Sequence, residues 1–275
     1  MVFFSSADFA FPLLSHEKAL RLVALLDFKW VDIGLFQDRS HIQPSDQLDD
    51  PDRKGTNLKK MVTEIGLGIS DIFFQSALDF KARAINHPDK AIRSKQRDIY
   101  DRLLEYTQAA GCRHISALPG VDFETPDSFE ICRDELAWRV EKAAVAGITY
   151  GVEAHIGSIM TTPELAIKML NAVPGLSLTL DHSHFTWQGI GSEQVKPLVP
   201  YASHIHARGA AKGIMQAAVA DNTTDFTLVA QHCRESAYKG GICIEYTYTD
   251  WENCNQTDNI SESLLMRDKL SSLFS

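Results

Sequence analysis

The stretch GVEAHIGSIMTTPELAIKMLNAVPGLSLTLDHSH, residues 151–184, has the pattern of a strand, a helix and a second strand. Short apolar runs bounded by polar residues, glycine or proline are typical of buried parallel strands, and they predict strands over 148–155 and 176–183. Between them, TPE at 162–164 has the order of an N-cap, a first-turn proline and a first-turn acid. The segment NAVPG at 171–175 then ends the helix. Two parallel strands joined in this way form a βαβ unit.

The same alternation of apolar runs and amphipathic stretches continues through the whole chain. Apolar residues such as Ile99, Leu103 and Tyr106 repeat at the spacing of one helix face within 90–110. Further strands are expected over 2–9, 28–36, 67–75, 113–120, 203–208 and 241–248, and further helices over 15–26, 53–65, 127–146, 192–199, 223–238 and 258–274.

Eight such βα units within ~250 residues predict an α/β fold, a single (β/α)8 TIM barrel. A doubly wound Rossmann sheet is the main competitor among parallel folds. No GxGxxG fingerprint follows a predicted strand, which disfavours that competitor. No linker or low-complexity segment interrupts the alternation, so we expect one domain over residues 1–275.

The composition is that of a globular protein with an acidic balance. The 275 residues include 27 Lys and Arg against 36 Asp and Glu, which gives a net charge of −9. This charge argues against nucleic acid as a partner, and no apolar stretch approaches the ~20 residues of a membrane span. The first residues lack the basic region of a signal peptide, and five scattered cysteines without a CxxC pair fit reduced thiols. We therefore expect a cytoplasmic protein without a membrane partner.

Metal-capable side chains stand at the ends of the last four predicted strands. In a TIM barrel, the C-terminal strand ends form the active site. Each acid alone could be a helix cap or an ion-pair partner, but burying three carboxylates without a cation would cost several kcal/mol per unpaired charge. We therefore expect a divalent metal site at this rim, formed by Glu153, Asp181, His206 and Glu245.

Three carboxylates and one imidazole form a mostly hard set of donors. Such a set suits Mn²⁺ or Mg²⁺, with Co²⁺ as a further option, whereas Zn²⁺ usually takes more nitrogen or sulfur. Alternation along a strand directs Glu153 and His155 to the same face. His155 is thus either a catalytic base or a hydrogen-bonded structural residue. His184, three residues after Asp181, is expected to contact the metal or its ligands.

The run over 151–191 resembles the middle of the xylose isomerase-like TIM-barrel proteins, the sugar phosphate isomerase/epimerase group. The resemblance extends from residues 9–12 to the last helix. In that family a Glu, an Asp, a His and a second Glu from the last four strands bind one divalent metal, often Mn²⁺, and their positions match the four residues above. The D-x-x-H pattern of the family implies that His184 holds substrate. A substrate-binding cation six residues after the metal-binding His corresponds to Lys212, with Arg208 nearer.

One position departs from the ketose 3-epimerases of this group. They carry a Glu six residues beyond the first metal-binding Glu, where this chain has Ile159. The pattern E-x-H-x-G-S at 153–158 and the stretch RSHIQP at 39–44 are instead similar to large subunits of C-glycoside deglycosidases, lyases that act on 3-oxo-glycosides. That similarity implies His155 as a base and His41 as a second acid/base group. It also implies a smaller second subunit as an alternative to a homo-oligomer.

Both resemblances imply the same first step on a small sugar or oxo-sugar. A metal chelated by the carbonyl and adjacent hydroxyl oxygens acts as a Lewis acid, and a base removes the α proton. Reprotonation, with Glu153 and Glu245 as acid/base candidates, gives an isomer or epimer. Loss of a β-substituent makes the enzyme a carbon-carbon or carbon-oxygen lyase. An apurinic endonuclease would need more His ligands and a basic groove, and a non-catalytic barrel would have little use for the ligand set.

Overall fold

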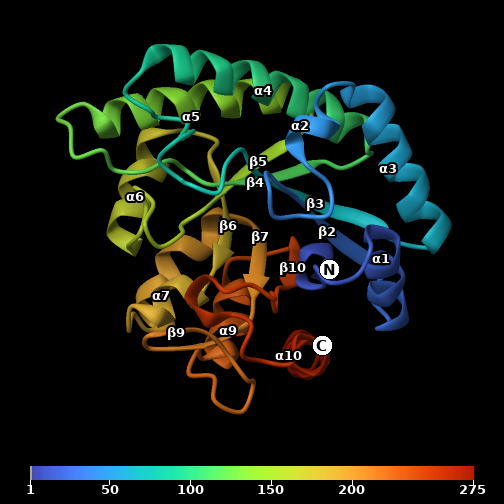
Figure 1. Ribbon diagram of the computed structural model, residues 1–275. Helices are drawn as coiled ribbons and strands as arrows, with labels where there is room; N and C mark the ends of the chain where they lie inside the picture. The colour runs from blue at the N-terminus through green and yellow to red at the C-terminus, as the bar shows by residue number, and fades with distance from the viewer. Residues whose placement is uncertain (1) are drawn as a thin grey trace.

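The computed structural model describes residues 2–275 and contains a closed barrel of eight parallel strands (Figure 1). The strands follow the order β1-β10-β7-β6-β5-β4-β3-β2 around the barrel. Seven of them lie within strands that the sequence pattern predicts, and β7 begins one residue before the predicted range 203–208, so the predicted TIM barrel is confirmed. The barrel strands are β1 (Phe3–Ala7), β2 (Trp30–Phe36), β3 (Gly68–Gln75), β4 (His114–Ala117), β5 (Thr149–Glu153), β6 (Ser177–Asp181), β7 (Ala202–Ala207) and β10 (Gly241–Ile244).

Helices cover the outside of the barrel and connect one strand to the next (Figure 1). At the start of α6, the Thr162 hydroxyl accepts a hydrogen bond from the Leu165 N–H at 3.4 Å, as its sequence predicts. Within residues 2–275, no helix has the length and apolar character that a membrane crossing requires. The long helices are α1 (His16–Leu25), α3 (Pro51–Ile65), α4 (Lys90–Ala109), α5 (Ser128–Val145), α6 (Pro163–Ala172), α9 (Phe226–Glu235) and α10 (Asn259–Phe274).

The prediction of a single helix over 192–199 is wrong. The chain instead forms a short α8 (Ser192–Val195) followed by a 3-10 helix, η2 (Lys196–Tyr201). Pro197 and Pro200 cause the change, because proline has no N–H to donate within a helix. Four other short helices, which the sequence pattern does not predict, follow strand ends: η1 (Asp8–Ala10), α2 (Pro44–Gln47), α7 (Ser183–Trp187) and η3 (Trp251–Asn253).

A small antiparallel hairpin after β7 is also absent from the sequence prediction. It consists of β8 (Gly209–Ala211) and β9 (Ile214–Ala217). The Gly209 N–H donates to the Tyr246 hydroxyl at 2.9 Å, and that hydroxyl donates to the Ala217 carbonyl at 3.1 Å. A side chain at position 209 would collide with the Ala217 carbonyl, so the close approach requires glycine.

Polar side chains fill the centre of the barrel, where TIM barrels usually place branched aliphatic residues. His204 on β7 lies 2.6 Å from Asp32 on β2, although these strands are not neighbours in the barrel. Ser116 on β4 is likewise hydrogen-bonded to Thr179 on β6. Such contacts across the barrel place the side chains inside it. Alternation along each strand directs the intervening apolar residues, such as Ile33, towards the helices.

Candidate active site

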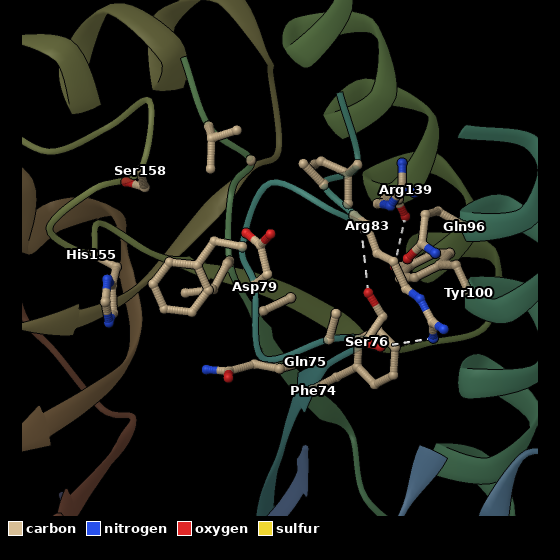
Figure 2. A pocket seen from close by; sticks show the side chains of 18 of the residues that line it. Phe74, Gln75, Ser76, Asp79, Arg83, Gln96, Tyr100, Arg139, His155 and Ser158 are labelled. Carbon is tan, nitrogen blue, oxygen red and sulfur yellow. Dashed lines mark hydrogen bonds between the residues drawn. The ribbon is translucent and has the colours of Figure 1, made fainter. Parts of the chain in front are cut away.

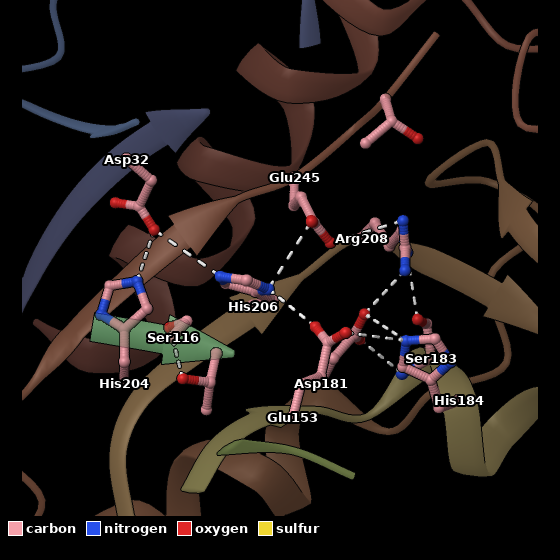
Figure 3. Close-up of polar contacts among 12 residues, drawn as sticks. Asp32, Ser116, Glu153, Asp181, Ser183, His184, His204, His206, Arg208 and Glu245 are labelled. Atoms are coloured by element: carbon pink, nitrogen blue, oxygen red, sulfur yellow. Dashed lines mark hydrogen bonds and ion pairs between the residues drawn. The ribbon is translucent and has the colours of Figure 1, made fainter. Parts of the chain in front are cut away.

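Three of the four predicted metal ligands converge at the C-terminal end of the barrel (Figure 3). Glu153 is the last residue of β5, His206 lies near the end of β7, and Glu245 follows β10 directly. The Nδ1 atom of His206 is 3.0 Å from Glu153 Oε1 and 3.6 Å from Glu245 Oε1. All three side chains are buried. One donor atom from each lies within 4.8 Å of the others, so this group could hold a metal ion.

The fourth predicted ligand, Asp181, is paired with an arginine from β7's carboxyl end. Its Oδ2 atom accepts a hydrogen bond from Arg208 Nη2 at 2.8 Å. Arg208 also donates to Ser183 Oγ at 3.0 Å, and its Nη1 lies 3.4 Å from Glu245 Oε2. Arg208 therefore neutralises two of the acids at the rim. The sequence predicts it as a substrate-binding residue, but the structure shows its guanidinium engaged with the site's own carboxylates.

His184 lies between two of the acids without a hydrogen bond to either. Its Nε2 atom is 3.6 Å from Glu153 Oε2 and 3.6 Å from Asp181 Oδ2. Short α7 begins at Ser183, two residues after the end of β6, and this turn directs the imidazole back to the rim. Glu153, His155 and His184 form a second group whose donor atoms lie within 4.8 Å of one another.

Burial and mutual contacts move the pKa values of these groups in different directions. Burial opposes ionisation of Glu153, but the nearby imidazole of His184 and the hydrogen-bonded imidazole of His206 hold its pKa well below the ordinary value. Burial, reinforced by repulsion from Glu153, raises the pKa of Glu245 despite Arg208 and His206. Burial alone would lower the pKa of His206, but Glu245, Asp32 and the hydrogen-bonded Glu153 raise it well above the ordinary value. The acids of the rim therefore favour a cationic group between them.

Buried polar atoms without a hydrogen-bond partner support a cation at this position. Within residues 2–275, Glu245 Oε2 and His184 Nε2 are such atoms at the rim. Leaving polar groups unsatisfied in a buried site is costly, and a divalent ion satisfies carboxylate and imidazole donors together. The oxygen-rich set of donors, with one or two imidazoles, fits a hard or borderline divalent ion.

A cavity of about 370 Å³ opens directly above these donors. The part of the cavity nearest the donors is lined by Glu153, His155, Arg208 and Glu245. Arg39 and Phe36 lie together on another part of the wall. The imidazole of His155 packs 4.2 Å from His184 and 5.1 Å from Trp251, measured between ring centroids. The other lining residues are Phe9, Pro12, Leu13, Asp38, Phe73, Gln75, Phe80, Thr247, Tyr248, Thr249, Asp250 and Trp251.

Burial, together with the nearby imidazole of His184, lowers the pKa of His155 to about 3. The imidazole is therefore neutral at pH 7. Its Nδ1 atom is bonded to the Ile156 carbonyl, which assigns the hydrogen to Nδ1 and leaves Nε2 as an acceptor. Within residues 2–275, Nε2 has no hydrogen-bond partner of its own. A neutral imidazole can accept a proton, but a pKa of about 3 makes it a weaker base than one with a pKa near the working pH.

Two other predicted residues lie away from the cavity lining. His41 Nε2 contacts the Asp8 carbonyl at 3.2 Å, and its ring stacks on His16 at a centroid distance of 5.3 Å. Lys212 is exposed at the turn of the β8–β9 hairpin, where its side chain packs near Gly189. The structure brings neither residue to Glu153 and Glu245.

The structure identifies two site residues that the sequence analysis does not predict, Arg39 and Asp32. Arg39 lines the cavity two residues before His41. Asp32 lies below the rim, with Oδ2 at 2.6 Å from His204 Nε2 and 3.6 Å from His206 Nε2 (Figure 3). A carboxylate in the middle of the apolar strand 28–36 was the available signal for Asp32, because a buried acid requires a partner.

A second cavity of about 60 Å³ adjoins the first (Figure 2). The two share Gln75, Phe80 and His155 as lining residues. Arg83 lies in the smaller cavity and donates to the Ser76 carbonyl at 3.1 Å, as Figure 2 shows. The smaller cavity runs between the ends of β3 and β4 and the helices α4 and α5.

The chain belongs to the xylose isomerase-like TIM barrel family, whose model matches residues 20–270. A solved L-ribulose 3-epimerase is similar to it with a TM-score of 0.79 and 16% identity, over 100% of this chain and 95% of the other. A D-psicose 3-epimerase from Clostridium cellulolyticum H10, solved with D-tagatose, gives 0.78 and 13%, over 99% of each chain.

A third similar structure comes from another reaction class. It is a probable 3-DHS dehydratase from Bacillus anthracis, with a TM-score of 0.70 and 12% identity, over 96% of this chain and 98% of the other. At these identities the likeness establishes the fold. No curated protein matches the chain significantly in sequence.

Proposed function

We propose that this protein is a divalent-metal-dependent enzyme that enolises a sugar or oxo-sugar, in the manner of a sugar isomerase or epimerase. The observation that carries the proposal is the convergence of Glu153, His206 and Glu245 beneath the cavity of a xylose isomerase-like barrel. Sugar 3-epimerases among the similar structures support the substrate class.

The ion would be held by Glu153, His206 and Glu245, with Asp181 as the fourth ligand once Arg208 releases its carboxylate. We propose Mn²⁺, with Mg²⁺ or Co²⁺ as substitutes, because oxygen donors predominate. When bound, the ion supplies Lewis-acid polarisation of the substrate carbonyl.

The residues of the chain would then move the proton. Glu153 and Glu245 both line the cavity, so one carboxylate can take a proton from an α carbon while the other returns one. His184, and Arg208 once it has released Asp181, would orient the substrate oxygens.

A second candidate is a lyase of the C-glycoside deglycosidase type, which cleaves 3-oxo-glycosides by β-elimination. The neutral imidazole of His155, with a free Nε2 acceptor in the cavity wall, favours it. In this reaction His155 would remove the α proton and the β-substituent would leave with the electron pair of the broken bond. The leaving group would take its proton from an acid of the site or from water.

One experiment separates these candidates. The metal content of the purified protein is measured, and the protein is then incubated with ketoses and with 3-oxo-glycosides in D₂O. Deuterium at the α carbon of a ketose supports the epimerase, and elimination from a 3-oxo-glycoside supports the lyase. Absence of both reactions in metal-loaded protein would contradict the proposed function. Cytoplasmic location and association, as a homo-oligomer or with a second subunit, stay predictions.

A further inference from the structure

The cavity above the candidate metal ligands is lined by two arginines that differ in what they bind. Arg208 is occupied, because its three guanidinium nitrogens face Asp181, Ser183 and Glu245 at 2.8 to 3.4 Å. Arg39 forms no ion pair with any residue of 2–275, and its Nη2 donates to Gln75 Oε1 at 3.0 Å. Arg39 therefore retains donors that are free for a ligand.

The structure holds the Arg39 guanidinium in one orientation. Its central carbon lies 4.7 Å from the ring centroid of Phe36, and the hydrogen bond to Gln75 fixes one edge of the plane. A cation over an aromatic face is stabilised there. A planar guanidinium with a fixed edge presents its remaining N–H groups as a fork, which matches the two oxygens of a carboxylate.

The charges around the cavity mouth do not occupy this fork. Asp38 and Asp250 also line the cavity, but both are exposed. Their carboxylates accept hydrogen bonds from Gln37 at 2.9 Å and from Asn255, respectively. Neither carboxylate is paired with Arg39, so the fork of this exposed side chain stays open to a ligand.

We propose that Arg39 binds a carboxylate of the substrate, so that the site takes an acidic sugar in preference to a neutral one. The sugar chain would extend from Arg39 across the cavity to Glu153 and Glu245, which line the same space. This inference rests on the proposed function and narrows its substrate class. It makes Arg39 a specificity-determining residue of the cavity.

The test compares the binding of two probes that differ at one carbon. D-gluconate and D-glucitol share a polyol chain, but gluconate ends in a carboxylate where glucitol has a hydroxymethyl group. Their dissociation constants are measured by calorimetry on Mn²⁺-loaded wild type, Arg39→Gln, Arg39→Lys and Arg83→Gln. Arg83 is the matched control, because it lies in the neighbouring cavity and donates to a backbone carbonyl. The same titrations are repeated after the metal is chelated.

We expect the wild type to bind gluconate about tenfold or more tighter than glucitol, since hydrogen bonds to charged groups are worth this much. Arg39→Gln should bring the ratio of the glucitol and gluconate dissociation constants close to one. Arg83→Gln should leave this ratio unchanged, and Arg39→Lys should give an intermediate value. In the wild type, the preference for gluconate should also persist without metal. Equal binding of the probes, no binding of gluconate, or a preference that survives Arg39→Gln would overturn the inference. Deuterium exchange into neutral ketoses alongside such a result would leave the proposed function standing.

Discussion

The Nε2 atom of His206 lies 3.6 Å from Oδ2 of Asp32, while Nδ1 of the same ring lies 3.0 Å from Glu153. The two ring nitrogens therefore face different partners, one below the rim and one at it. Asp32 is fully buried and also accepts hydrogen bonds from Ser5 at 2.7 Å and His204 at 2.6 Å. The Asp32 carboxylate favours a hydrogen on the Nε2 that faces it, which leaves Nδ1, the nitrogen at the rim, to bind a metal.

Replacement of Asp32 should therefore weaken metal binding. For Asp32→Asn we expect about 10- to 100-fold lower affinity for Mn²⁺, the usual cost of losing such a carboxylate. Affinity is measured by calorimetry. Glu135→Gln is the matched control, because Glu135 is also a buried acid and pairs with Arg139 at 2.8 Å rather than with a metal ligand. Equal losses of affinity in the two variants would show that Asp32 acts only through stability.

Removal of one carboxylate at the rim should abolish turnover. We expect Glu245→Gln to lower kcat by at least about 100-fold, because Glu245 serves both as a ligand and as a proton carrier. Metal content and deuterium exchange are measured on the same preparation. Glu235→Gln is the control, since Glu235 pairs with Lys196 at 3.0 Å on the surface. Full activity of Glu245→Gln after chelation would rule out the metal-dependent mechanism.

The two histidines implied by the lyase resemblance should behave differently. His155→Ala should lose β-elimination on a 3-oxo-glycoside by about 100-fold or more while it still binds metal. His41→Ala should retain the activity, because His41 stacks on His16 outside the cavity lining. Product formation and metal content decide the outcome. If His155→Ala retained epimerase activity, proton transfer would be assigned to the glutamates. If His41→Ala lost β-elimination activity, His41 would be the acid that protonates the leaving group.

Acid should destabilise the fold through a histidine outside the ligand set. Burial lowers the pKa of His182 from the ordinary 6.5 to about 4. The unfolded chain takes up a proton that the folded chain rejects, so the free energy of unfolding falls as pH drops from 6.5 towards 4. The contribution of this one group is about 3 kcal/mol. Urea unfolding of wild type and His182→Asn at several pH values measures it, and identical pH slopes in both proteins would refute the assignment.

The sequence predicts the strand positions and the convergence of side chains at one rim well, because both follow from a two-residue alternation and from parallel strands, whereas binding of a metal there stays a prediction. Glu153, His206 and Glu245 meet for this reason. The loop after β2 has no such periodicity, so the choice between Arg39 and His41 depends on how its turn folds. The pairing of Asp181 with Arg208 depends on the rotamer of a long side chain, which tertiary contacts decide. Asp32 could have been identified by its isolation among apolar residues.

The hydroxyl of Tyr246 restricts how the residues of the rim can move relative to one another. By joining Gly209 to Ala217 it fastens the start of the hairpin to the segment that carries Glu245. Arg208 precedes Gly209 directly, and Glu245 precedes Tyr246. Arg208 and Glu245, whose charged groups lie 3.4 Å apart, are thus carried on two segments that the Tyr246 hydroxyl joins by hydrogen bonds. Any displacement of Arg208 that frees Asp181 must either rotate its side chain in place or move the hairpin and the end of β10 together.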